Sequence, residues 1–389
     1  MTEKINKNVI NKITYLIKAG NLSAAKKDVN YALKKDSNSI FLLNSLSLIL
    51  FKEGKLNESI DISKKILLLD DNNIDALINI GNSLKEKGEA KPALKYFFKI
   101  LEIDESNEYV NYNIAMILYD AREFNKAFEF FKLSKYADFN EKMMQCKYKI
   151  GHFDEFNSML NNEINKPNIS RTISSLSAHA SVNLKQKDDY KFCKNPLDFI
   201  YKKNIDDQSF VKELNEKIDK MVIDNRNQDL LKNGKQTAGN IFEKTDRHFS
   251  SLKETIFTAM NDYYKKYHEE NNEFINQWPK SKNINGWIIN MSENGFLKPH
   301  IHEKGWISGT LYLKLPKKID NQGKIKFGIH GYDYPKLHDD FPSKTVSINE
   351  GDIIMFPSSL FHETIPFKGD KRICIAFDIN PWQKNDWKD

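Results

Sequence analysis

The sequence of 389 residues exceeds the length of one typical domain, so two or three domains are expected. A hydrophobic content of 40%, with 25 Phe, is sufficient for sizeable cores and excludes a disordered chain. The charge surplus of +6 is spread along the chain instead of clustering among aromatics, and no apolar run approaches about 18 residues, so neither a nucleic acid nor a membrane is expected as a partner.

The cysteines and the first residues indicate the cellular compartment. Only Cys146, Cys193 and Cys374 occur, with no CxxC spacing, which argues against a disulfide framework and a zinc ribbon. The first twenty residues lack the apolar segment and small-residue cleavage site of a signal peptide. We therefore expect a cytoplasmic protein.

The first part of the chain repeats with a period of 34 residues. Glycines recur at this spacing, and a small residue follows each of them by five positions: Gly20, Gly54 and Gly88, then Ala25, Ser59 and Ala93. The register continues through Arg122 and Ala127, and a degenerate fifth unit is expected around Gly151. The pattern, clearest in "ALINIGNSLKEKGEAKPALKYFFKILEID", resembles the tetratricopeptide repeat, a helix-turn-helix unit.

This resemblance implies an all-α solenoid over residues 1–165. Such solenoids present a concave groove to a peptide or partner protein, although many serve only for packing or dimerisation. A peptide or protein is therefore the expected partner of the repeats, and the sequence does not name it.

The period is lost after the repeats, and the composition changes. Residues 166–195 are rich in Ser, Asn and Lys and are interpreted as a linker, with room for one more helix. In residues 196–389, helices are expected at Ser209–Ile223 and His248–Glu270. Alternating apolar runs then predict eight strands in an α+β domain of sandwich or jelly-roll type. The predicted strands are 285–290, 296–303, 307–315, 323–328, 344–348, 352–356, 360–366 and 371–379.

Two histidines one residue apart precede one of these runs. Strand side chains alternate between faces, so His300 and His302 point to one side and Ile301 to the other. A third histidine, His362, lies just beyond a later apolar strand, and Arg372 follows it by ten residues. A jelly roll can bring these positions together at one end of a barrel.

The layout resembles the Fe(II)/2-oxoglutarate-dependent oxygenases, and most closely a family of oxygenases often fused to tetratricopeptide repeats. The resemblance covers Pro196 to Trp382 and depends on the stretches "PHIHEKGWISGTLYL", "FPSSLFHETIPF" and "RICIAFD". It implies a double-stranded β-helix, or jelly roll, that uses Fe(II), dioxygen and 2-oxoglutarate as cosubstrate. The metal ligands it implies are His300, His302 and His362, and the cosubstrate contacts are Arg372, Tyr312 and Asn290.

Two residues depart from the superfamily pattern. His302 stands where most members keep Asp or Glu; three histidines can hold iron, but one negative charge is lost from the metal. The adjacent Glu303 is the alternative third ligand, although strand parity turns its side chain away from His300. Cys374 stands where relatives carry Ser or Thr.

The expected reaction is a hydroxylase-type oxidation of a peptide or protein that the repeats recruit. Two alternatives stay open: a partner-binding scaffold whose oxygenase domain is inactive, and a three-histidine enzyme of cupin type that does not use 2-oxoglutarate. Because all the metal motifs lie beyond residue 285, a chain starting near Asp188 is expected to fold alone.

Overall fold

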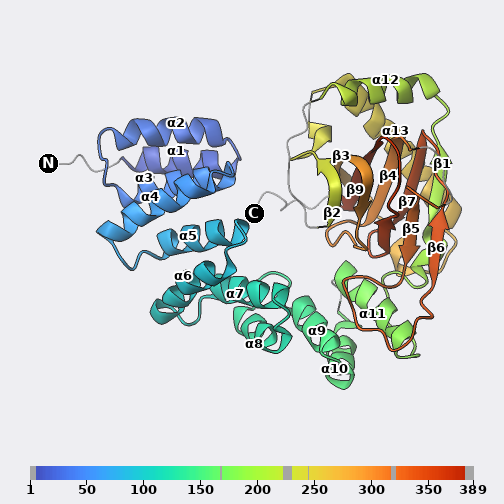
Figure 1. The fold of residues 1–389 in the computed structure, drawn as a ribbon, viewed down its shortest axis with the longest axis horizontal. Coiled ribbons are helices and arrows are strands. Elements are labelled where there is room, and N and C mark those ends of the chain that lie inside the picture. The colour runs from blue at the N-terminus through green and yellow to red at the C-terminus, as the bar shows by residue number, and fades with distance from the viewer. Residues whose placement is uncertain (1–5, 167–168, 222–229, 244, 317–320, 382–389) are drawn as a thin grey trace. The chain divides into compact units, whose positions relative to one another are not determined.

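The computed structural model describes residues 6–166, 169–221, 230–243, 245–316 and 321–381 (Figure 1). The chain divides into two compact units between His152 and Phe153. The predicted fold class is confirmed: helical repeats come first, and antiparallel sheets with accompanying helices follow. Within the described residues, no helix combines the length and the apolar character needed to cross a membrane.

The first unit consists of helical hairpins that recur every 34 residues. Helices α3, α5 and α7 begin at Ile40, Ile74 and Glu108, and the helix that follows each of them keeps the same period. This confirms the predicted repeat. The helices are α1 (Lys7–Lys18), α2 (Leu22–Leu33), α3 (Ile40–Lys52), α4 (Leu56–Leu69), α5 (Ile74–Glu86), α6 (Ala90–Ile103), α7 (Glu108–Asp120), α8 (Phe124–Ser134) and α9 (Phe139–Lys149).

Turn and packing residues explain the period. Gly88 adopts a left-handed φ of +77° between α5 and α6, a conformation that glycine reaches without steric cost. Arg122, which replaces the glycine in the next hairpin, keeps the same conformation with φ 61°. Within α5, a Cβ added at Gly81 would lie 2.6 Å from the Phe97 ring, so this glycine lets the two helices approach closely.

The second unit begins with α10 (Phe153–Glu163) and α11 (Arg171–Asn183). Helix α11 lies in the segment predicted as a linker, beside the loop that joins β5 (Ile325–Gly328) to β6 (Ser343–Val346) (Figure 1). His179 is fully buried there and stacks on Phe341 of this loop, with ring centroids 4.7 Å apart. The domain boundaries at residues 165 and 195 stay predictions.

Strands of the second unit form two antiparallel sheets. The larger has the order β1-β7-β4-β9-β3-β2, and the smaller has the order β6-β5-β8. Their remaining strands are β1 (Tyr201–Asn204), β2 (Leu231–Gln236), β3 (Lys282–Leu297), β4 (Ile307–Lys314), β7 (Asp352–Pro357), β8 (Phe361–Thr364) and β9 (Arg372–Pro381). Strands β3 to β9 overlap the predicted ones, with the first predicted strand and the start of the second merged in β3. Strands β1 and β2 were not expected.

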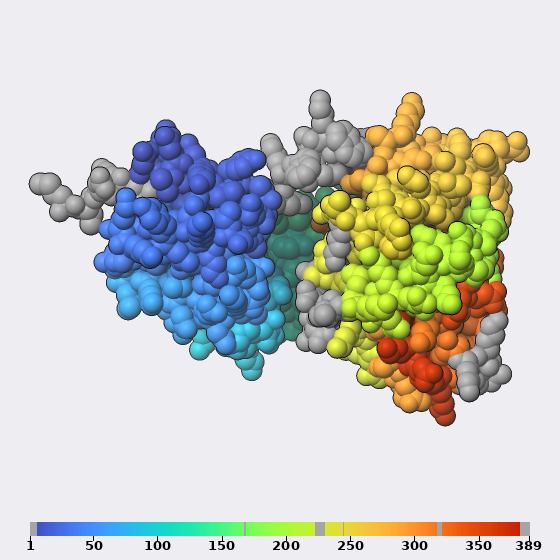
Figure 2. Space-filling view, turned by 90° about the horizontal axis from the view of Figure 1, so that it is seen from above, coloured from blue at the N-terminus to red at the C-terminus, as the bar shows by residue number. Residues whose placement is uncertain are grey.

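Short helical elements accompany the sheets. Helix α12 (Gln208–Asp219) packs against β4, and α13 (Arg247–Tyr267) packs against β7; Figure 2 shows their green and yellow outer surface. Both overlap the predicted helices, although the predicted end at Ile223 lies outside the described residues. The smaller elements are η1 (Pro196–Phe199), η2 (Ile241–Glu243) and α14 (Glu273–Asn276).

An apolar core joins the two sheets. It contains Ile289, Tyr312 and Cys374 from the larger sheet, and Ile325 and Phe327 from the smaller one. The candidate site lies between the sheets, over this core.

Candidate metal centre

Backbone pairing brings the three predicted histidines together. His300 and His362 form an isolated antiparallel bridge, with hydrogen bonds of 3.1 and 3.0 Å in the two directions. The backbone N–H of His302 donates to the Ser358 carbonyl at 3.0 Å, which holds the second histidine of the pair against the same segment. One nitrogen from each imidazole lies within 4.8 Å of the other two, so three metal-ligating atoms converge.

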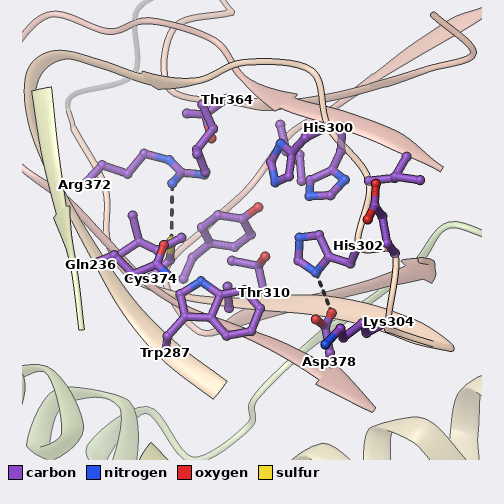
Figure 3. A pocket seen from close by; sticks show the side chains of 18 of the residues that line it. Gln236, Trp287, His300, His302, Lys304, Thr310, Thr364, Arg372, Cys374 and Asp378 are labelled. Atoms are coloured by element: carbon purple, nitrogen blue, oxygen red, sulfur yellow. Dashed lines mark hydrogen bonds and ion pairs between the residues drawn. The ribbon is translucent and has the colours of Figure 1, made fainter. Parts of the chain in front are cut away.

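Each imidazole is oriented by an oxygen at its Nδ1 atom. The His300 Nδ1 lies 2.8 Å from the Lys298 carbonyl oxygen, and the His362 Nδ1 lies 3.2 Å from that of Leu360. The His302 Nδ1 lies 2.5 Å from Asp378 Oδ1, as the dashed line in Figure 3 shows. A proton donated from each Nδ1 leaves the Nε2 lone pair as the ligand, the arrangement common in protein metal sites.

Burial keeps two of these histidines neutral. It lowers the pKa of His300 to about 4 and holds the pKa of His362 well below its ordinary value, with the neighbouring histidines acting in the same direction. Neutral imidazole is the form that binds Fe(II). The residues present therefore fit such a metal.

Glu303, the alternative ligand, takes a different position. Its side chain is exposed and lies near Tyr332. The burial of Tyr332 is the largest cause that raises the pKa of this tyrosine, and the charge of Glu303 is the second. The converging ligand atoms found in the described part of the chain include His302 and no carboxylate.

A buried cation lies at the other end of the same cavity. Arg372 is only 2% exposed; its Nε donates to the Gly323 carbonyl at 3.1 Å and its Nη1 to Cys374 Sγ at 3.4 Å (Figure 3). Among the ion pairs of the described residues, none involves Arg372. A buried charge without a counter-ion is costly, so this guanidinium is suited to receive an anion from outside.

Tyr312 adds a hydroxyl beside this cation. The Arg372 guanidinium carbon lies 5.0 Å from the centre of the Tyr312 ring. The Tyr312 hydroxyl is buried and makes no hydrogen bond of normal geometry to the described residues. Burial raises the pKa of Tyr312, although the nearby Arg372 opposes the shift, so the hydroxyl stays protonated and available as a donor.

The histidines, Arg372 and Tyr312 line one cavity of about 510 Å³. Asn290 is not brought to it. On β3, Ile289 pairs with Cys374 and lines the cavity, whereas Asn290 pairs with Ile373 and so points to the opposite face of the sheet.

Several lining residues were missed by sequence reasoning. Thr364 on β8 and Gln236 on β2 line the cavity, and Asp378 on β9 contacts His302. A signal for Asp378 existed in the sequence, because it shares strand parity with Arg372 and Cys374. Gln236 carried no signal, since its strand was not expected.

Comparison with known families agrees with this site. Residues 285–378 match the family model described as "Putative 2OG-Fe(II) oxygenase". The match includes the three histidines and Arg372. The resemblance predicted from the sequence is thus confirmed over these residues. Comparison with curated protein sequences gives no match.

Solved structures similar to this chain include three that align with 40–47% of it. A MamA structure has 17% identity and a TM-score of 0.36, and the alignment covers 40% of this chain and 88% of that one. YrrB, titled "a TPR protein with an unusual peptide-binding site", has 20% identity, a TM-score of 0.34 and coverages of 40% and 84%. PilF of Pseudomonas aeruginosa has 17% identity, a TM-score of 0.42 and coverages of 47% and 86%.

Proposed function

We propose that this protein is an Fe(II)- and 2-oxoglutarate-dependent dioxygenase that hydroxylates a peptide or protein. The observation that carries the proposal is the buried Arg372, without a carboxylate partner among the described residues, in the same cavity as three converging histidines. A dicarboxylate that chelates a metal at one end needs a cation at its other end. This cavity offers three metal-ligating histidines at one end and the Arg372 guanidinium at the other.

The chain's own residues have separate roles in this reaction. His300, His302 and His362 hold the metal as neutral ligands, with their Nδ1 atoms fixed by oxygens. Fe(II), when bound, supplies the centre at which dioxygen oxidises the substrate while 2-oxoglutarate loses carbon dioxide and becomes succinate.

Arg372 and Tyr312 would bind the distal carboxylate of 2-oxoglutarate. The planar guanidinium can donate two parallel hydrogen bonds to a carboxylate, which lysine does not reproduce. The Tyr312 hydroxyl, which makes no hydrogen bond of normal geometry to the described residues, would supply a further donor. Their burial keeps water away from the bound carboxylate and strengthens the contact.

We further propose that the repeats bind the protein substrate or its carrier. Polar side chains connect the first helices of successive hairpins: Asn82 donates to the Tyr109 hydroxyl at 2.9 Å, and Lys85 donates to Asn113 at 2.5 Å. The side-chain oxygens of Asn44 and Asn82 are buried and accept no hydrogen bond from the described residues. Both oxygens belong to half-buried side chains, so a bound peptide would reach them with its main-chain N–H groups only after these amides turn outward.

The direct test is reconstitution of the full chain with Fe(II) under anaerobic conditions, followed by exposure to oxygen and measurement of succinate. Succinate that requires both Fe(II) and 2-oxoglutarate supports the proposal. Oxygen consumption that ignores 2-oxoglutarate would instead indicate a cupin-type enzyme. Absence of metal binding would leave a partner-binding scaffold.

A further inference from the structure

Asp378 contacts the metal centre through His302. One carboxylate oxygen, Oδ1, accepts hydrogen bonds from both His302 Nδ1 at 2.5 Å and Ser308 Oγ at 2.6 Å. The side chain is only 16% exposed and lies on the cavity wall (Figure 3). The carboxylate is thus held in place while it contacts a predicted ligand.

Two serine hydroxyls and the strand pairing around them keep this carboxylate in position. Ser308 is directly opposite Asp378 in the pairing of β4 with β9, and its hydroxyl also lies 2.8 Å from that of Ser358. The Ser358 carbonyl in turn accepts from the His302 backbone. A Cβ added at Gly305 would lie 2.3 Å from Ser358 Oγ and 3.2 Å from Asp378 Oδ1, so only glycine fits there.

We infer that Asp378 is a positioning residue that supplies, through His302, the negative charge that the ligand set itself lacks. The inference rests on the proposed function, because it needs a metal at the histidines. A carboxylate that accepts from Nδ1 fixes the ring's orientation and tautomer and makes Nε2 a stronger donor to the metal. The centre is then a three-histidine site whose carboxylate, that of Asp378, does not bind the metal but hydrogen-bonds to one of the ligands.

A purely structural role for Asp378 predicts something different. In that case its loss would lower the stability of the metal-free protein and leave the affinity of the folded protein for metal unchanged. A role through His302 predicts a loss of metal affinity that depends on this imidazole. Metal affinity and metal-free stability therefore have to be measured side by side.

The experiment compares Asp378→Asn with Glu363→Gln in the full chain. Glu363 follows His362 directly, but its carboxylate accepts from Lys326 at 2.9 Å, so this control removes the same charge near the site without touching a ligand through its side chain. Co(II) and Fe(II) affinities are measured anaerobically, with the visible Co(II) spectrum as a report on ligand geometry. We expect Asp378→Asn to lower the affinity for both metals by about 10- to 100-fold and to alter the visible Co(II) spectrum.

Two results would overturn the inference. The first is metal affinity in Asp378→Asn equal to that of Glu363→Gln. The second is a visible Co(II) spectrum of Asp378→Asn identical to that of the unaltered chain, because a residue that orients the His302 imidazole should change the ligand geometry when its charge is lost. If the unaltered chain binds no metal, the proposed function itself fails. Failure of the proposed function is thus distinguished from failure of the inference about Asp378, in which the unaltered chain does bind metal.

A second measurement needs no variant, so it stands even if Asp378→Asn does not fold. In the zinc-loaded protein with ¹⁵N-labelled histidine, long-range ¹H–¹⁵N correlation reports which ring nitrogen carries the proton. For His302 we expect a proton on Nδ1, shifted downfield by the carboxylate, and zinc on Nε2. A proton on Nε2, or zinc on Nδ1, would contradict the inference.

Discussion

The guanidinium of Arg372 lies 5.0 Å from the ring centre of Tyr312, and the tyrosine hydroxyl beside it is buried and makes no hydrogen bond of normal geometry to the described residues. Among the described residues, neither group meets an anionic side chain. This makes Tyr312 the simplest residue with which to separate ligand binding from folding.

Tyr312→Phe should leave the metal-free protein about as stable as before, because the hydroxyl that is removed makes no hydrogen bond of normal geometry to the described residues. The 2-oxoglutarate affinity of the Fe(II)-loaded protein should fall by about three- to tenfold, the loss of one hydrogen bond to a carboxylate. Urea unfolding and anaerobic titration measure the two effects. Lost stability with unchanged affinity would mean that the hydroxyl is structural.

The identity of the third ligand is tested by four variants. His300→Ala, His302→Ala and His362→Ala should each abolish Fe(II) binding, since each removes one of three converging nitrogens, while the helical signal of the repeats persists. Glu303→Gln should change Fe(II) affinity less than about twofold, because this exposed side chain is not among the converging ligand atoms. Anaerobic competition with a chelator gives the affinities. If Fe(II) binding were retained in His302→Ala but lost in Glu303→Gln, Glu303 and not His302 would be the third ligand.

The metal-free protein should lose stability as the pH falls from about 6.5. An unfolded histidine takes up a proton near pH 6.5, whereas burial lowers the pKa of His300 to about 4 in the folded protein. Between these values the unfolded state binds more protons, so acid favours unfolding. From pH 6.5 to 5, His300 alone should lower the free energy of unfolding by about 1.6 kcal/mol, and His362 adds to this in the same direction.

Urea unfolding across this pH range measures the effect, with His300→Gln as the control. The variant should show a smaller loss between pH 6.5 and 5, because its side chain does not titrate. Equal pH dependence in both proteins would mean that His300 is not held neutral by burial.

Helix α11 should be required by the oxygenase-like unit. Arg171 donates to the Gly305 carbonyl at 2.7 Å, just after the histidine pair, and Asn183 accepts from the Leu337 backbone at 2.7 Å. A chain that starts at Phe153 should fold, whereas one that starts at Asp188 should lose several kcal/mol, roughly 1 kcal/mol for each lost hydrogen bond plus the apolar contacts of the helix. This reverses the expectation from sequence alone.

Thermal unfolding followed by circular dichroism compares the two truncated chains. Equal midpoints would show that α11 adds nothing to the unit. They would also restore the boundary near Asp188.

Sequence patterns predicted the elements whose signal is local. The 34-residue period and most of the alternating strands can be recognised from neighbouring residues. Strand parity predicted His300 and His302 on one side of strand 296–303, but β3 ends at Leu297, and His300 lies in an isolated bridge with His362. The serine-rich residues 166–195 predict a linker with room for one more helix, and α11 is that helix. Its Ser174, Ser175 and Ser177 are buried, because small side chains let the helix pack closely. Strands β1 and β2 are polar at the sheet edges and lack a clear alternation.

Long-range pairing explains the remaining differences at the site. Asp378 meets His302 across 76 positions of sequence, and only the register of β4 with β9 brings Ser308 to the same carboxylate. Asn290 resembled a cosubstrate contact because it is polar and precedes the histidine pair. The observed register pairs Met291, not Asn290, with Arg372.

The measurement that tests the central claim most directly is anaerobic titration of 2-oxoglutarate into the Fe(II)-loaded full chain and its Arg372→Met variant. The variant should keep its iron, and without the buried unpaired charge its metal-free form should be no less stable. We predict that its 2-oxoglutarate affinity falls tenfold or more, a loss of roughly 1.5–3 kcal/mol for a charged hydrogen bond. Equal 2-oxoglutarate affinity in the two proteins would contradict the account.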